Sequence, residues 1–128
     1  MRLIDFGLLT KYKDNNGQHI QNGIEDKFRG SLLFASKYAF NYVRPSRRDD
    51  MISLVYLLVF FLDASRLTFV ELVRQEDRHR KFELIKEAKM RLGPGELCGL
   101  SMDETSAYCI YEFCEIIFNL EFEEKPDY

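Results

Sequence analysis

The sequence has no surplus of positive charge. It carries 18 Lys and Arg residues against 21 Asp and Glu residues, which gives a formal net charge of -3 at pH 7. Proteins that bind nucleic acid or an anionic membrane surface use an excess of basic side chains to neutralise phosphate charge. The composition therefore predicts neither a nucleic-acid partner nor a membrane partner.

Cysteine is scarce, and long apolar runs are missing. The three cysteines, Cys98, Cys109 and Cys114, are an odd number without C-x-x-C spacing, which favours neither a disulfide framework nor a zinc site. The longest apolar stretch, residues 51–62, falls well short of the roughly 18 residues that span a bilayer. The first residues lack the apolar core of a secretory signal. We therefore expect a cytoplasmic or nuclear protein.

The residues that are present suffice for one folded unit. Of the 128 residues, 46% are hydrophobic and 14% are aromatic. This composition is typical of a compact domain with its own core and not of a disordered chain. We expect a single domain over residues 1–128.

The first third of the chain predicts a short hairpin followed by a long loop. Residues 2–4 and 8–12 are short apolar segments on either side of a Gly-containing turn, which predicts a short N-terminal β-hairpin. Residues 13–45 are polar and keep neither a helical nor a strand period. A loop of about 30 residues far exceeds the usual connection of about 4–6 residues, and such loops are usually functional or disordered.

The segment after this loop predicts a buried helix over residues 46–62. Ser46 is a suitable N-cap, and Asp49 and Asp50 lie in the first turn, where their charges favour the helix dipole. Residues 51–62 are apolar nearly all round. We therefore expect other elements to enclose this central helix on every side.

The remaining residues predict helices that cover the central one. Residues 68–73 and 76–91 have apolar positions at helical spacing, which indicates an amphipathic pair. Gly93-Pro94-Gly95 ends the second helix, and a last helix is expected from residue 103 to about residue 119. The predicted fold class is therefore mainly α.

Short motifs spread along the whole chain carry a resemblance to a known family. In chain order they are IDFGL (4–8), KYKD (11–14), QHI (18–20), GSLLFAS (30–36), SRRDD (46–50) and EKPDY (124–128). An Asp-Phe-Gly tripeptide alone is a weak signal, because three common residues recur by chance. Followed by a long loop, then Gly30-Ser31, then Asp50 at the start of a buried helix, it resembles the C-terminal lobe of a protein kinase.

The whole set is similar to the casein kinase I family of Ser/Thr protein kinases, with SRRDD and Lys-Pro-Asp-Tyr as the specific matches. The resemblance implies a C-lobe, a helical bundle around the buried helix 46–62, in which residues 13–45 correspond to the activation segment. It also implies phosphoryl transfer from ATP to Ser or Thr of protein substrates.

The resemblance assigns roles to individual residues. Asp5 would hold Mg²⁺, because this ion prefers hard oxygen ligands, while Phe6 would pack beneath the metal and Gly7 would give the backbone freedom. Gly30 and Ser31 would face the substrate, although a loop Ser that bonds its own backbone is about equally expected.

The other two roles concern the start of the central helix. Asp50 would anchor the backbone of the catalytic loop, or act simply as a charge at the helix N-terminus. Arg47 and Arg48 are expected either to pair with acidic groups, which we favour, or to contact an anion.

Most of the catalytic parts of a kinase are absent from the sequence. The Gly-rich loop, the ATP-binding Lys and the catalytic Asp all precede Asp-Phe-Gly in kinases. We therefore expect the chain alone to hold Mg²⁺ and ATP only weakly and to have no autonomous activity. The expectation is a partial kinase domain that acts with the N-lobe and catalytic loop of a longer parent. The alternative is a non-catalytic, pseudokinase-like module that binds protein partners.

Some residues depart from the family pattern. Val55 stands where the family has Gly, and Leu33 stands where it has an Arg that would receive acidic substrates. A preference for acidic substrates is therefore not predicted. Without the preceding lobe, the central helix would expose apolar area, so we expect the free chain to be molten or to associate.

Overall fold

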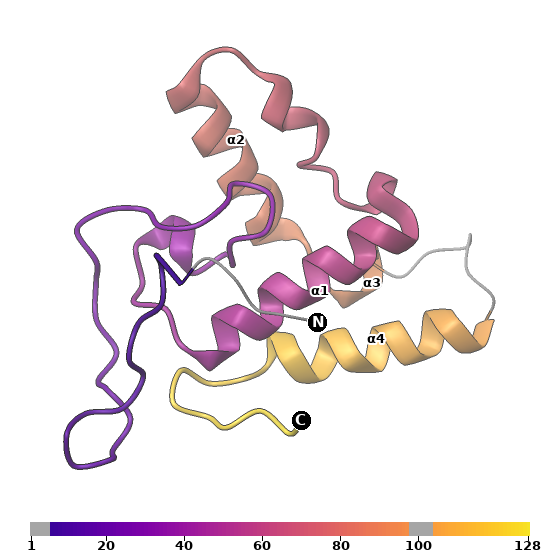
Figure 1. Ribbon diagram of the computed structural model, residues 1–128. Coiled ribbons are helices and arrows are strands. Elements are labelled where there is room, and N and C mark those ends of the chain that lie inside the picture. The colour runs from indigo at the N-terminus through magenta and orange to yellow at the C-terminus, as the bar shows by residue number, and fades with distance from the viewer. Residues whose placement is uncertain (1–5, 98–103) are drawn as a thin grey trace.

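The structure is a computed structural model that describes residues 6–97 and 104–128. It is mainly helical, as the sequence predicts (Figure 1). The helices are α1 (Arg47–Asp63), α2 (Arg78–Arg91), α3 (Pro94–Leu97) and α4 (Glu104–Phe118), with short 3-10 helices at Ala39–Asn41, Ala64–Arg66 and Glu71–Arg74. None of the described helices combines the length and the apolar character that a membrane span requires.

The predicted N-terminal β-hairpin is not seen in the described residues. Residues 8–12 form no strand, and residues 2–4 lie outside the described part of the chain. The chain instead turns back shortly afterwards, because the Asp14 carboxylate accepts hydrogen bonds from the backbone N–H groups of Asn16 (2.8 Å) and Gln18 (2.9 Å). A strand needs a neighbouring strand for its backbone hydrogen bonds, and the described residues offer residues 8–12 no such ladder.

Residues 13–45 form an irregular arm that leads into α1 (Figure 1). Within this arm the described strand-like pairings are two isolated bridges, Lys13 with His19 and Ile24 with Val43. The end of the arm is attached to the core by Phe40, which is fully buried and has ring centroids 4.9 Å from Phe28 and 5.0 Å from Phe82.

Helix α1 begins at the predicted N-cap. The backbone N–H of Ser46 donates to Asp49 Oδ2 at 2.9 Å, which is the reciprocal arrangement of a capping box. The inward face of α1 is formed by Ile52, Val55, Tyr56 and Val59, whose side chains are at most 1% exposed. This face is the centre of the hydrophobic core.

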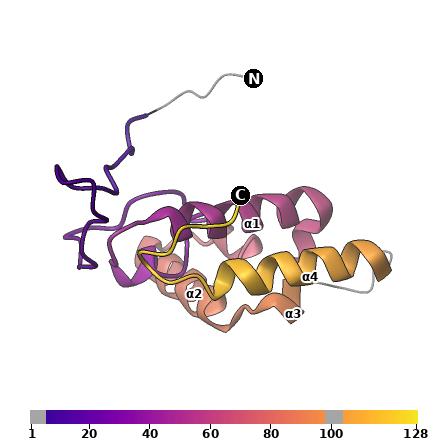
Figure 2. The ribbon, with the colours of Figure 1, turned by 90° about the horizontal axis from the view of Figure 1, so that it is seen from below.

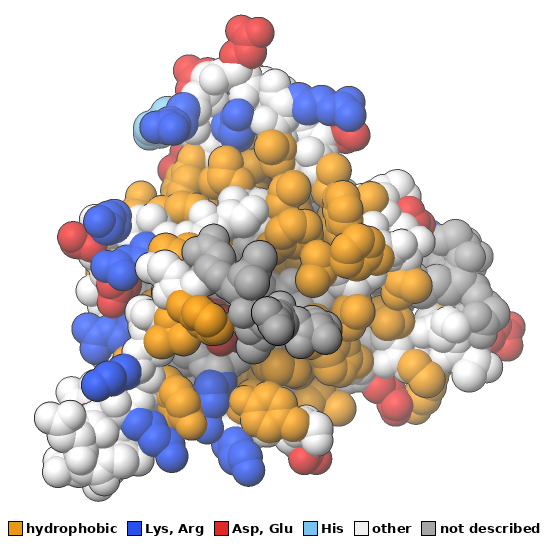
Figure 3. Space-filling model, viewed as in Figure 1, with side chains coloured by type: hydrophobic (Ala, Val, Ile, Leu, Met, Phe, Trp, Pro, Cys, Tyr) orange, Lys and Arg blue, Asp and Glu red, His pale blue; other side chains and the backbone are white. Residues whose placement is uncertain are grey.

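Among the described residues, helix α1 is not enclosed on every side. This differs from the enclosure predicted for the helix, but it agrees with the apolar area that we expect a chain without the preceding lobe to expose. Leu54 (39% exposed), Leu58 (37%), Phe61 (75%) and Leu62 (59%) lie together on one side of the helix, which we call the outer face of α1. Figure 3 shows apolar side chains gathered over α1 on this side of the molecule. A helix that is apolar all round is expected to be buried by other elements, but the described residues bury only part of the surface of α1.

Helix α4 covers another side of α1. The two helices pack against each other and run in opposite directions (Figures 1 and 2). Cys114 and Ile117 of α4 are at most 2% exposed. The last helix thus lies within the predicted range and contributes directly to the core.

Helices α2 and α3 complete the bundle. The Asp77 carboxylate caps α2 by accepting from the backbone N–H of Arg80 at 2.8 Å. Pro94 begins α3, a position where its missing N–H costs nothing. Residues 68–73, predicted as a helix, form turns that lead into the 3-10 helix Glu71–Arg74. A run this short lacks the hydrogen bonds that a stable α-helix accumulates along its length.

Candidate functional site

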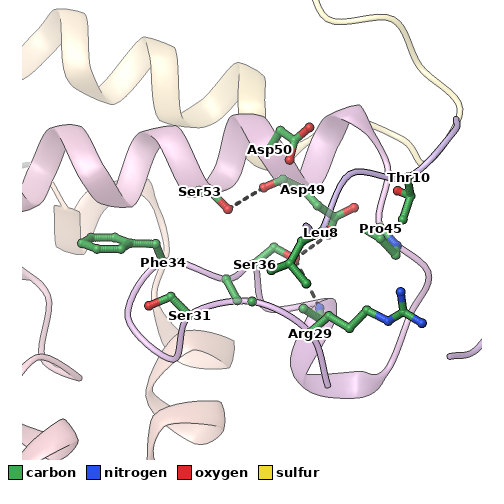
Figure 4. Close-up of a pocket in the computed structure, with 13 residues that line it drawn as sticks. Leu8, Thr10, Arg29, Ser31, Phe34, Ser36, Pro45, Asp49, Asp50 and Ser53 are labelled. Carbon is green, nitrogen blue, oxygen red and sulfur yellow. Dashed lines mark hydrogen bonds between the residues drawn. The ribbon is translucent and has the colours of Figure 1, made fainter. Parts of the chain in front are cut away.

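The loop that carries Gly30 and Ser31 meets the start of α1 at a cavity of about 210 Å³ (Figure 4). Asp49 and Asp50 line the cavity from α1, and Ser36 lines it from the loop. The structure therefore brings together two of the predicted site segments, the loop at 30–36 and the helix start at 46–50. This junction is the candidate functional site.

Asp49 is the polar centre of the junction. Its side chain is 8% exposed, and its Oδ1 accepts a hydrogen bond from the hydroxyl of Ser36, which is also buried. The same carboxylate accepts the backbone N–H of Ser46. A single buried carboxylate thus joins the loop to the helix N-terminus, and Figure 4 shows its bond to Ser36. The Ser46-x-x-Asp49 spacing could have indicated this role, because it is the pattern of a capping box.

Asp50, the predicted anchor, has no such partner among the described residues. Its carboxylate lines the cavity (Figure 4). Burial raises the pKa of Asp50, and the neighbouring Asp49 carboxylate raises it further. The described loop is therefore held by Asp49, while the acceptor capacity of Asp50 stays open toward the cavity.

Gly30 and Ser31 form a tight turn at the edge of the cavity. Gly30 has φ +111°, and a Cβ added there would lie 3.3 Å from the Ala35 Cβ, so the position favours glycine. The Ser31 hydroxyl accepts a hydrogen bond from the backbone N–H of Leu33 at 3.2 Å. Of the two roles expected for Ser31, the bond to its own loop is present.

Arg48 lies inside the molecule beside this junction. It is 5% exposed, and its guanidinium carbon lies 3.5 Å from the centroid of the Tyr38 ring. Its Nη2 is 3.8 Å from Asp49 Oδ2. Burial, an aromatic face and a carboxylate together favour the structural role over contact with a free anion.

Arg47 connects α1 to the C-terminal segment. It donates from Nη2 to the backbone oxygen of Glu123 at 2.8 Å. Its guanidinium carbon lies 4.8 Å from the centroid of the Tyr12 ring. Arg47 therefore also has a structural role, since it holds Tyr12, just before the arm, and the C-terminal segment against the start of α1.

Lys89 is a central residue that the sequence reasoning missed. It is 0% exposed, and its Nζ donates to the backbone oxygens of Leu33 at 2.7 Å and Ala35 at 2.6 Å. Burial lowers the pKa of Lys89 to about 7. The one signal in the sequence was its register, because Lys89 follows Phe82 and Ile85 at helical spacing on the face that points to the core.

The Asp-Phe-Gly segment lies at the edge of what the structure describes. Asp5 falls outside the described residues, and Phe6 is 61% exposed. The described residues contain no group of three or more His, Cys, Asp or Glu side chains that could hold a metal ion. No model of a known protein family matches the sequence. The resemblance therefore depends on the motifs themselves.

Proposed function

We propose that this chain is part of the catalytic domain of a Ser/Thr protein kinase of the casein kinase I type. In this proposal the full domain transfers phosphate from ATP to Ser or Thr of protein substrates. The chain is its C-lobe, the arm 13–45 is the activation segment and α1 is the central helix. The chain alone is inactive, because the Gly-rich loop, the ATP-binding Lys and the catalytic Asp are not in its sequence.

The open outer face of α1 is the observation that carries this proposal. Four large apolar side chains on one helix face are between 37% and 75% exposed. Apolar patches of this kind mark a surface that another element covers. The part of a kinase domain that precedes Asp-Phe-Gly would cover the central helix, which accounts for a helix that is apolar nearly all round.

Asp50 supports the same proposal. Its carboxylate has no hydrogen-bond or ion-pair partner among the described residues, and burial together with the charge of Asp49 raises its pKa. Asp50 is exposed to water in the described structure, and N–H donors that replace this water would stabilise its carboxylate. The catalytic loop of the full domain would provide them.

Mg²⁺ and ATP are the cofactors that the proposal implies. Asp5 would be the Mg²⁺ ligand, since a carboxylate is the hard oxygen donor that this ion prefers. The described residues do not themselves make a metal site. We therefore assign no step to the cofactors in this chain and expect it to bind Mg²⁺-ATP weakly on its own.

The departures from the family pattern bear on substrates more than on fold. Val55, which replaces a Gly, is 1% exposed and packs within the core. Leu33, which replaces an Arg, leaves no cation at its position for an acidic substrate. We propose protein Ser or Thr as the acceptor and assign no preference for or against acidic sequences.

A non-catalytic protein-binding module is the second candidate. The outer face of α1 also favours it, because the same apolar residues would bind a separate protein. The two candidates differ in their dependence on Asp5. A binding module keeps its partner affinity in Asp5→Ala and shows no nucleotide-dependent thermal shift, whereas the full kinase domain loses activity with this substitution.

The transcript upstream of the Met1 codon tests the proposal directly. We expect an in-frame H-R-D-x-x-x-x-N sequence, which carries the catalytic Asp and the Asn for the second metal. In-frame stop codons without such a sequence would contradict a kinase parent and favour the binding module.

A further inference from the structure

We propose that Lys89 is a positioning residue that holds residues 31–36, the anchored loop, on the helical core. Its ammonium group comes from α2 and binds the loop through the backbone oxygens of Leu33 and Ala35, at 2.7 and 2.6 Å. The bonds join residues more than 50 positions apart in the sequence. The inference goes beyond the proposed function, because it concerns the position of the loop and requires no phosphoryl transfer.

The surroundings of Lys89 are those of a cation held without a carboxylate. None of the ion pairs among the described residues includes Lys89. Its Nζ lies 4.4 Å from the ring centroids of Tyr56 and Phe69 and 5.2 Å from that of Phe40. Aromatic faces and carbonyl dipoles offset part of the cost of burying the charge. The position therefore favours a long hydrogen-bond donor over an apolar residue.

The anchored loop is held from two helices at once. Lys89 of α2 binds Leu33 and Ala35, and Asp49 of α1 binds the next residue, Ser36, through its hydroxyl. Between these anchors the loop closes on itself, since the backbone N–H of Ala35 donates to the oxygen of Ser31 at 2.8 Å. The position of Ser31 at the cavity is thus set by two buried side chains that lie 40 residues apart in the sequence.

Removal of the Lys89 donor leaves backbone oxygens without a partner inside the core. Lys89→Met keeps the length of the side chain but donates no hydrogen bond, so the oxygens of Leu33 and Ala35 lose their donor. A buried acceptor that has lost its partner retains the full cost of desolvation. The loop regains hydrogen bonds only if it moves toward water, which exposes its own internal amides.

Amide hydrogen exchange of the 128-residue chain tests the inference. Lys89→Met is expected to speed exchange at the amides of Ala35, Ala39 and Val43 by about tenfold or more, through local opening of the loop. Amides of α4 are expected to exchange as before. The control is Lys86→Met, three residues earlier on the same helix, for which the structure gives no hydrogen bond or ion pair within the described part. It is expected to change neither region.

The ammonium group of the unsubstituted chain provides a second measurement, which does not depend on the stability of a variant. With ¹⁵N-labelled lysine below pH 7, where Lys89 is protonated in the folded chain, Lys89 is expected to show a side-chain signal whose protons exchange more slowly with water than those of the other lysines. Slow exchange here and selective loosening of the loop in Lys89→Met support the inference. Fast exchange of the Lys89 protons, or equal loss of protection in the loop and α4 of the variant, would overturn it.

Discussion

The hydroxyl of Ser36 donates a hydrogen bond to the carboxylate of Asp49, and both side chains are buried at the junction between the loop and α1. This bond joins two of the motifs that carry the resemblance to a kinase. It also explains why the acidic pair at the start of α1 is not a pair of equivalent charges. The Asp49 carboxylate is hydrogen-bonded within the structure, whereas the Asp50 carboxylate lines a cavity.

Replacement of the two acidic residues should therefore have unequal effects. Asp49→Ala removes the acceptor for both Ser36 and the backbone of Ser46, and we expect it to lower the free energy of unfolding by about 2–4 kcal/mol. Asp50→Ala removes no described hydrogen bond and relieves repulsion, so a change below about 1 kcal/mol is expected. Urea unfolding of both variants measures the difference. Equal losses would show that Asp49 is not the anchor.

The buried Lys89 predicts a particular dependence of stability on pH. Burial lowers its pKa from 10.5 to about 7 in the folded chain. Between these values the unfolded chain binds a proton that the folded chain does not, so stability rises with pH in this window. The effect of one group is at most about 1.4 kcal/mol per pH unit.

The comparison of the unsubstituted chain with Lys89→Met isolates this effect, because the other titrating groups are common to both. We expect urea unfolding from pH 7 to about pH 9 to show a steeper rise for the unsubstituted chain. Below about pH 7 the difference between the two chains should be constant, since Lys89 is then protonated in both states. Parallel curves over the whole range would show that the pKa of Lys89 is not lowered.

The outer face of α1 predicts that the free chain associates. The inward face of α1 is packed in a core, so we expect association of folded chains and not loss of the fold. Leu58→Glu with Phe61→Glu places charge on the face and should shift the chain toward a monomer in light scattering. Ile24→Glu is the matched control, because Ile24 is 72% exposed on the arm. An equal effect of both substitutions would mean that association does not involve α1 specifically.

The turn at Gly30 predicts a cost for any side chain. Gly30→Ala forces a Cβ into a left-handed backbone conformation and 3.3 Å from the Ala35 Cβ. We expect a loss of about 1–2 kcal/mol in the free energy of unfolding. Gly95→Ala, where a Cβ would meet nothing within 4 Å, is the control and should be neutral or slightly stabilising. A neutral Gly30→Ala would show that the turn adapts.

Local patterns predicted α1 and its cap because both depend on neighbours in the sequence. Ser46, the acidic first turn and the apolar run are close to one another along the chain. The helix that became α4 was predicted from a local pattern in the same way. The burial of Lys89 depends instead on its hydrogen bonds to the backbone oxygens of Leu33 and Ala35. These residues are distant in sequence, so no local pattern predicts the contact. Lys89 therefore looked like one more charge on an amphipathic helix.

The enclosure of α1 shows a different limit. The apolar side chain of Phe61 predicts that this position is buried. It does not indicate whether an element of the same chain buries it. The second predicted strand was wrong for a related reason, since an apolar segment at 8–12 becomes a strand only beside a partner. The role of Asp5 stays a prediction, because it lies outside the described residues.

A phosphoryl-transfer assay tests the central proposal most directly. The N-lobe and catalytic loop of a casein kinase I enzyme are fused ahead of this chain, so that the Asp-Phe-Gly motif in the fusion is residues 5–7 of this sequence. We expect the fusion to phosphorylate casein, the chain alone to be inactive and Asp5→Asn in the fusion to lose at least about 100-fold in rate. A folded fusion that is no more active than its Asp5→Asn variant would contradict the proposal.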